Sequence, residues 1–269
     1  MSETTEISAS LVKQLRDQTG AGMMACKQAL QETEGDLEAA RTLLRERGMA
    51  AAGKRADRAT TEGLVGYRIE GNRGTMVAIG CETEPVSKFE AFQEFGEKVL
   101  RTLHADGSGA LEGLESERTE LIAQLGENIV IIEPHRFEGG TLAAYVHPPA
   151  NKIGVVVQLE GGTAELARQL AMHISFAAPQ YTGREDVPAE IVAAERQILT
   201  NSDEVQSKPE QAREKIVDGM LAKRFFAASP GGALLDQAWI HDASKSVGAV
   251  LSEAGATVTG FARVSVAGS

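Results

Sequence analysis

Glu82 and Glu84 form a carboxylate pair that could supply a general acid and a general base. On an extended strand, side chains two residues apart share one face, so the two carboxylates would lie together. Pro85 follows at once, so we expect the pair at an exposed corner between a strand and a helix. No histidine or metal triad accompanies the pair. An acid–base enzyme is therefore one hypothesis for this chain, and an exposed acidic corner is the default interpretation.

The run Gly20-Ala21-Gly22-Met23-Met24-Ala25 fits G-x-G-x-x-A, a dinucleotide-binding pattern. That pattern holds a pyrophosphate only where a strand precedes its first glycine. The residues before Gly20 have helical spacing instead, which argues against a bound dinucleotide. The chain also contains no G-x-x-x-x-G-K-[ST]. We therefore expect no cofactor and no nucleotide phosphate held by this chain itself.

The histidines and cysteines form no pattern typical of a metal or nucleophile site. No two histidines are four residues apart, and neither H-E-x-x-H nor G-x-S-x-G occurs. Cys26 and Cys81 lie in segments of opposite periodicity, which argues against a disulfide scaffold or a metal cage. We expect no metal and no catalytic residue. His173 lies in an apolar helical pattern, and we expect it to be a core residue with its hydrogen bonds satisfied.

The charge balance argues against nucleic acid as a direct partner. Lys and Arg number 27 against 38 Asp and Glu, a formal net charge of -11, whereas proteins that grip phosphates carry basic patches. Lys54, Arg55 and Arg58 could form a local basic face, but we interpret them as a solvated linker. The N-terminal segment has no signal-peptide pattern, and no apolar stretch is long enough to span a bilayer. We expect a cytoplasmic protein that does not bind membranes.

Residues 1–50 have the pattern of a module of three short helices, followed by a linker at 51–61. Apolar residues recur at helical spacing in three runs, which are separated at Gly20 and at Gly35-Asp36. Ser8 or Ser10 could cap the first helix and Asp36 the third. We expect Gly48 to end the third helix, because glycine favours helix termini.

Residues 62–140 change to strand-like periodicity and predict a first core subdomain. Leu64–Ile69 and Thr75–Cys81 flank a turn and predict a β-hairpin. Ser87 and Glu90 have the spacing of a capping box that opens an amphipathic helix. A second helix is expected at about residues 111–125 and a strand at 129–133.

Residues 141–269 repeat this plan and predict a second, related subdomain. Tyr67 and Tyr145 are separated by the same interval as Val77 and Val155. The closing strands, after Gly126 and Gly255, are separated by a longer interval, so the second copy contains an insertion.

The pattern of that insertion predicts a helical hairpin at about residues 187–227, with Val187, Ile191, Ala194 and Ile198 on one apolar face. Ser207 and Glu210 suggest a second capping box. The expected fold class is therefore α+β: a three-helix module that resembles ubiquitin-associated domains, two related subdomains with antiparallel sheets and helices, and an inserted helical hairpin.

Met23 and Met24 are adjacent, so one helix cannot bury both on the same narrow stripe. We expect one to pack inside and the other to be at least partly exposed as an adaptable apolar contact for a partner. The alternative is that both pack within the small module.

The chain resembles bacterial elongation factor Ts over nearly its whole length. The resemblance rests on Leu15-Arg16, on Thr19-Gly20-Ala21-Gly22-Met23-Met24 and on Cys26-Lys27 with Ala29-Leu30. Ala171-Met172-His173 and Val258-Thr259-Gly260-Phe261 are similar to later segments of the family. The order of module, linker, subdomains and hairpin is similar too.

The resemblance implies a guanine nucleotide exchange factor that binds elongation factor Tu. It implies docking on a Tu helix through Leu15, Arg16, Met23 and Met24. It implies that the corner Thr83-Glu84-Pro85-Val86 displaces Mg²⁺ from the Tu nucleotide site, and that the hairpin contacts another part of Tu.

Two features depart from the family. The usual corner resembles Thr-Asp-Phe-Val, whereas this chain has Glu84 and Pro85. The sequence also ends soon after Phe261, without the C-terminal extension of some relatives.

A further hypothesis is a plain protein-binding adaptor, which would bind Tu or another protein and leave GDP release unchanged.

Overall fold

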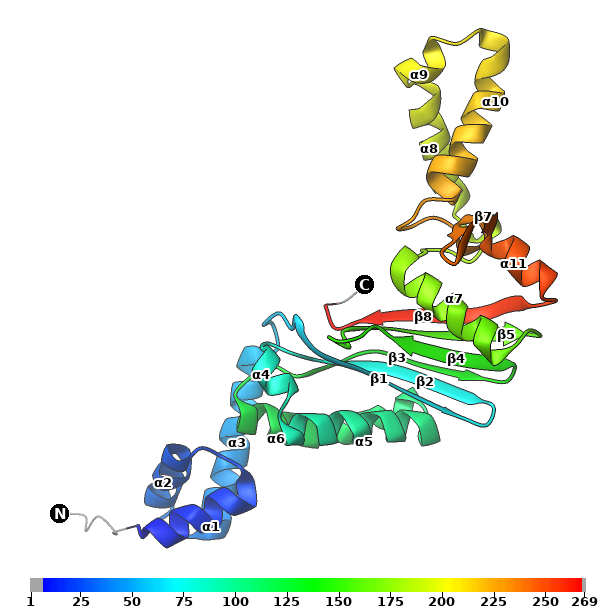
Figure 1. Ribbon diagram of the computed structural model, residues 1–269. Helices are drawn as coiled ribbons and strands as arrows, with labels where there is room; N and C mark the ends of the chain where they lie inside the picture. Colours follow the sequence, from blue (N-terminus) through cyan, green and yellow to red (C-terminus); the bar gives the residue numbers. More distant parts are fainter. Residues whose placement is uncertain (1–6, 268–269) are drawn as a thin grey trace.

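The computed structural model describes residues 7–267 (Figure 1). Residues 1–6 and 268–269 lie outside this range. Most of the N-terminal segment in which the sequence shows no signal-peptide pattern is therefore not among the described residues. Within residues 7–267, no helix is both long enough and apolar enough to cross a membrane.

The N-terminal module consists of α1 (Ala9–Thr19), α2 (Met23–Glu32) and α3 (Leu37–Arg55), as the sequence predicts. The Ser8 hydroxyl accepts from Leu11 N–H at 3.2 Å, and the Asp36 carboxylate accepts from the amides of Glu38 and Ala39. Gly20 ends α1 with φ of 67°. Both predicted N-caps are confirmed, and the enclosed core consists of Val12, Leu15, Cys26, Ala29, Leu30 and Ala40.

The prediction that Gly48 ends the third helix is wrong, because α3 continues to Arg55 through the first part of the predicted linker. Gly48 is buried against α6 (Glu115–Leu125), where an added Cβ would lie 2.5 Å from Ala123 Cβ. Glycine at this position therefore serves close helix packing instead of helix termination.

The first sheet has the order β1-β2-β3, with β1 (Glu62–Glu70), β2 (Arg73–Cys81) and β3 (Val130–Glu138) all antiparallel. The predicted hairpin is confirmed. The third strand occurs where predicted and runs further, to Glu138. Helices α5 (Glu90–Asp106) and α6 cover one face, and a 3₁₀ helix, η1 (Ser108–Leu114), connects them.

The predicted capping box at Ser87 and Glu90 is wrong. Ser87 ends a short helix, α4 (Glu84–Ser87), and its hydroxyl donates to the Glu84 carbonyl at 2.7 Å. The N-cap of α5 is Phe89, whose side chain makes no capping hydrogen bond. Pro85 favours a separate first turn at Glu84, because its φ is fixed in the helical range.

The second sheet repeats the first, with the order β4-β5-β8 for β4 (Thr141–Val146), β5 (Ile153–Glu160) and β8 (Thr257–Ser265). Helices α7 (Ala164–Ala177) and α11 (Val247–Glu253) pack on its outer face. In both sheets the closing strand pairs with the second strand of the hairpin. The chain therefore has an α+β fold with two related subdomains.

The repeat holds for Val77 and Val155, which both face the helices of their own subdomain. It fails for the tyrosines. Tyr67 lies opposite Met76 on the face between the sheets, whereas Tyr145 lies opposite Val155 on the helix face. A one-residue difference in the connection between paired strands reverses the face of a side chain.

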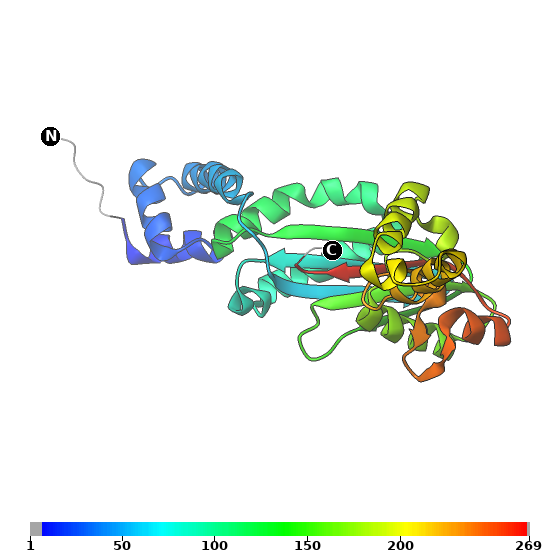
Figure 2. The ribbon, with the colours of Figure 1, turned by 90° about the horizontal axis from the view of Figure 1, so that it is seen from above.

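The inner faces of the two sheets pack against each other, which gives four layers in the order helix, sheet, sheet, helix (Figure 1). Gly154 permits the close approach, because an added Cβ would lie 2.5 Å from Val65 Cγ1. Viewed from above, the N-terminal module extends beyond one end of the sheets (Figure 2). The buried residues between the sheets are Val65, Met76, Ala78, Val156, Ala262, Val264 and Val266.

The inserted hairpin projects away from the sheets (Figure 1) and consists of α8 (Ala189–Thr200), α9 (Asp203–Gln206) and α10 (Glu210–Met220). A π-helical turn, η3 (Leu221–Phe226), continues α10. The base includes 3₁₀ turns at Arg184–Asp186 and Leu234–Asp236 and a small sheet of β6 (Ala238–Trp239) and β7 (Asp242–Ser246).

The predicted capping box of the hairpin is wrong, and most of the hairpin's core residues lie outside the predicted apolar face. Ile191 and Ile198 are exposed, while Leu199, Val205, Val217 and Leu221 fill the hairpin's own core. Ser207 does not cap α10, because its hydroxyl donates to the Glu204 carbonyl and Pro209 occupies the N-cap.

Gly48 and Gly53 provide a matched test of the packing of α3 against α6, since both lie in α3. Around Gly53, apart from its chain neighbours and the adjoining backbone of α3, no atom lies within 4 Å of an added Cβ. Gly53→Ala should therefore stabilise the protein by about 0.5–1 kcal/mol through helix propensity. Gly48→Ala should destabilise it by about 1–3 kcal/mol, because the methyl group must displace α6. Urea unfolding of both variants measures the difference, and equal stabilisation by both would contradict the close contact with Ala123.

Candidate functional site

The predicted corner lies where β2 ends and α4 begins. Thr83, Glu84 and Pro85 are exposed, whereas Val86 is buried in the core under the first sheet. Cys81, the last residue of β2, is also buried, and its thiol donates to the Thr83 carbonyl at 3.3 Å. Burial raises the pKa of this thiol to about 12, so it stays protonated. The corner is thus an exposed tip on a packed base.

The Glu127 carboxylate holds the corner from beneath. It accepts from the amides of Glu82 and Thr83 at 3.0 and 2.9 Å, and from the Thr83 hydroxyl at 2.5 Å. Hydrogen bonds to an ionised acceptor are stronger than those between neutral groups. Three of them on two consecutive residues fix the direction in which the backbone leaves β2.

Asn128, the next residue, joins the corner to the end of the N-terminal module. Its amide N–H donates to Glu82 Oε1 at 2.7 Å, and its side-chain Nδ2 donates to the carbonyls of Ala56 and Arg58. The Arg58 guanidinium pairs with Glu82 at 3.3 Å. Sequence reasoning missed Glu127 and Asn128, whose only signal is their position directly after the helix-ending Gly126.

The structure does not bring Glu82 and Glu84 together as an acid–base pair. Glu84 begins α4, so the extended spacing that would place both side chains on one face does not apply. Glu82 contacts Arg58 and Asn128, whereas Glu84 pairs with Lys88 at 2.7 Å. The hydrogen bond from Lys88 lowers the pKa of Glu84, which makes that carboxyl a poorer general acid. Among residues 7–267, no group of three His, Cys, Asp or Glu side chains could hold a metal ion.

The predicted docking residues of the module divide into two kinds. Met23 and Met24 are 55% and 76% exposed at the start of α2, and Arg16 is exposed on α1. The expectation that one methionine packs inside is wrong, because Cys26, Ala29 and Leu30 already fill the inner face of α2. Leu15 is fully buried and supports this surface from within.

A family model described as "Elongation factor TS" matches residues 82–268, from the corner onward. Curated relatives extend the similarity to the N-terminal module. Elongation factor Ts of Idiomarina loihiensis is 41% identical over 97% of this chain and 91% of its own length. Those of Klebsiella pneumoniae and Alkalilimnicola ehrlichii are 41% and 39% identical, each over 97% of this chain and 92% of their own lengths.

The chain belongs to the elongation factor Ts family. This membership makes it a protein of translation elongation with an exchange function. The match over 97% of the chain includes the corner, the module and the hairpin, so all three are parts of an elongation factor Ts chain.

His173, in the family-like segment Ala171-Met172-His173, is a core residue as predicted. Its Nδ1 accepts from Ile240 N–H at 3.3 Å, so the ring proton resides on Nε2, which donates to Gln237 Oε1 at 3.0 Å. The ring stacks on Trp239, and burial lowers the pKa of His173. Gln237 Nε2 donates in turn to the Ala228 carbonyl at 2.8 Å. These contacts hold α7 against the base of the hairpin.

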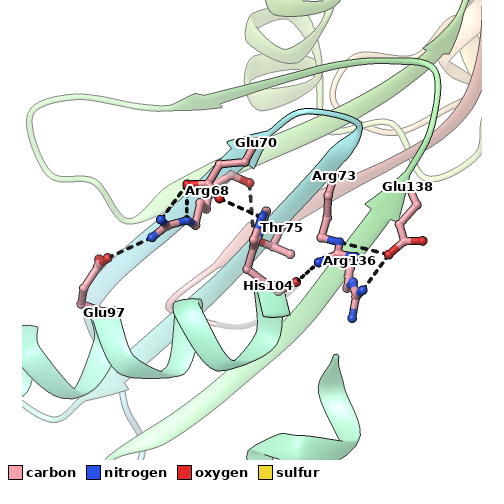
Figure 3. A network of polar contacts seen from close by, with 8 residues as sticks. All are labelled: Arg68, Glu70, Arg73, Thr75, Glu97, His104, Arg136 and Glu138. Carbon is pink, nitrogen blue, oxygen red and sulfur yellow. Dashed lines mark hydrogen bonds and ion pairs between the residues drawn. The ribbon is translucent and has the colours of Figure 1, made fainter. Parts of the chain in front are cut away.

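A second polar network lies at the far end of the β1–β2 hairpin, where α5 ends (Figure 3). Arg73 donates to the His104 carbonyl at 2.9 Å, and the Thr75 hydroxyl lies 3.1 Å from His104 Nδ1. Burial lowers the pKa of His104. Arg73 also pairs with Glu138 of β3. These contacts hold the C-terminal end of α5 against the sheet, at the opposite end from the corner.

Glu127→Ala should loosen the corner without disturbing the core beneath it. The amides of Glu82 and Thr83 would lose their acceptor, at a cost of about 1–2 kcal/mol in the free energy of unfolding. Hydrogen exchange at these two amides should accelerate, while Val77 and Ile79 in β2 stay protected. Glu112→Ala, at an exposed glutamate of η1, is the control. Unchanged exchange at Glu82 and Thr83 would show that Glu127 does not hold the corner.

Proposed function

We propose that this chain is the guanine nucleotide exchange factor of elongation factor Tu in the cytoplasm. It binds Tu–GDP and promotes GDP release by pressing the corner of Thr83, Glu84, Pro85 and Val86 toward the Mg²⁺ and phosphate site of Tu. It needs no cofactor or metal of its own and binds neither nucleic acid nor membrane. The observation that carries the proposal is a corner that is exposed at Glu84 and Pro85 yet held by Glu127 from below.

A rigid corner is what such a mechanism requires. Displacing a bound metal needs a group that keeps its position while the partner yields. Buried Val86 beneath the tip and three hydrogen bonds to one carboxylate meet this requirement. Pro85 adds stiffness, because its ring fixes φ. The corner therefore displaces its target by position.

Docking of the N-terminal module on Tu sets the position of the corner in this proposal. In this proposal Arg16, Met23 and Met24 contact a helix of Tu, while buried Leu15 keeps α1 and α2 in place. Two adjacent exposed methionines offer a flexible, polarizable apolar surface of the kind that adapts to a partner. The hairpin supplies a second contact, for which Ile191 and Ile198 are exposed on α8.

No covalent step is needed. By linkage, the exchange factor weakens nucleotide binding by the same factor by which the nucleotide weakens binding of the exchange factor. A thousandfold faster release corresponds to roughly 4 kcal/mol. An ordinary interface supplies that amount when it displaces one metal ion and several phosphate contacts.

Release of fluorescent GDP from elongation factor Tu tests this proposal directly. Substoichiometric amounts of this chain should accelerate release, because one molecule serves many Tu molecules in turn. High Mg²⁺ should oppose the effect until more of the chain is added. Binding to Tu without any acceleration at any dose would instead identify a plain adaptor.

Replacing Met23 and Met24 together with alanine should weaken docking about tenfold or more, since about 1–2 kcal/mol of apolar contact is removed at the interface. The free energy of unfolding should change by less than about 1 kcal/mol, because both side chains are exposed. Leu15→Ala is the contrasting variant and should cost about 2–5 kcal/mol of stability. Titrating nucleotide-free Tu gives the affinity. A large stability loss in the double variant would show that both methionines are structural.

A further inference from the structure

Phe89 is a large aromatic side chain that is 51% exposed beside the corner. It directly follows Lys88, the residue after α4, and is the N-cap of α5. Its carbonyl accepts from the amides of Phe92 and Gln93, both at 3.1 Å, so its backbone is fixed. Phe92 and Phe95, the next phenylalanines of α5, are buried in the core. Phe89 alone of these three keeps half of its surface in solvent.

Helix stability does not explain a phenylalanine at this position. An N-cap side chain normally accepts a hydrogen bond from the first turn, which contributes about 1 kcal/mol. Helices α1, α3, α7 and α11 use that device, through Ser8, Asp36, Thr163 and Ser246, whereas α2, α6, α8 and α10 begin without it. Phe89 cannot accept such a bond. A residue that forgoes a cap and also exposes an aromatic ring breaks two local rules at once, and such positions are typical of functional sites.

The corner has no other bulky apolar group to present. Among residues 82–90, Val86 is buried and Pro85 carries only a compact ring. The remaining exposed side chains are polar, and Glu84 and Lys88 form an ion pair across the tip. One aromatic ring within a charged rim is the composition of an interface hot spot, where a central apolar anchor is enclosed by polar contacts.

We propose that Phe89 is the apolar anchor of the corner and inserts into the nucleotide-binding domain of the GTPase. This inference rests on the proposed exchange function. The Phe89 ring enters an apolar depression on that domain next to its phosphate-binding region, because Phe89 belongs to the same tip as Glu84 and Pro85. Phe89 therefore sets how strongly the corner presses, while Met23 and Met24 set how tightly the module docks.

The test uses substitutions whose effects on stability and on exchange have opposite signs. Phe89→Ser introduces an N-cap acceptor and removes the ring, so the protein should be as stable as the parent or more stable. GDP release from elongation factor Tu at a fixed concentration of this chain should nevertheless slow at least tenfold. Phe89→Leu retains apolar bulk and should keep most of the activity. Tyr67→Ser, at an aromatic residue of β1 that is 48% exposed, should leave the rate within twofold of the parent.

The outcomes separate this inference from the proposed function. If the parent chain itself fails to accelerate GDP release, the exchange function is wrong and the role of Phe89 falls with it. If the parent is active and Phe89→Ser is stable and equally active, only the role of Phe89 is wrong. A clear loss of thermal stability in Phe89→Ser would also overturn it, because the ring would then be structural. Equal slowing by Tyr67→Ser would show a general effect of removing surface aromatic rings.

Discussion

The face-to-face packing of the two sheets is the constraint on which the rest of the structure depends. Each sheet has helices on its outer face and the other sheet on its inner face, so neither can shift without opening a buried apolar layer. Gly154 brings the layers close enough for Val65 and Met76 to contact the second sheet. The corner belongs to the first sheet and the hairpin base to the second. Their separation is therefore set by a close-packed interior, which resists deformation.

The N-terminal module is tied to the same frame. Helix α3 runs without a break from the module to Arg55, packs on α6 through Gly48, and leads to Ala56, whose carbonyl Asn128 binds. Asn128 also donates to Glu82 beside the corner. The proposed docking surface at Met23 and Met24 and the tip at Glu84 and Pro85 are thus connected through α3 and one short polar cluster. A partner that docked on the module as proposed would meet the tip in a defined position.

Local patterns predict the order of the elements well, because helix and strand periodicity, the Ser8 and Asp36 caps and the β1–β2 turn each depend on neighbouring residues. Local patterns do not predict features that depend on contacts between residues far apart in the chain. Gly48 has the sequence of a helix end, yet Ala123, far along the chain, makes it a packing site. Ile191 and Ile198 have core-like spacing, yet Leu199 and Val217 fill the hairpin interior. The only sequence signal of Glu127 is its position after Gly126, and its role exists only once β2 and the α6–β3 connection meet.

We propose that a corner held rigid by its own chain acts on a nucleotide bound by another protein. Hydrogen exchange on the complex with nucleotide-free elongation factor Tu measures this most directly, because it reports on both chains at once. We expect new protection at residues 83–89 and at the start of α2, together with faster exchange in the phosphate-binding region of Tu. Protection confined to the module and the hairpin, with residues 83–89 exchanging as in the free chain, would contradict it.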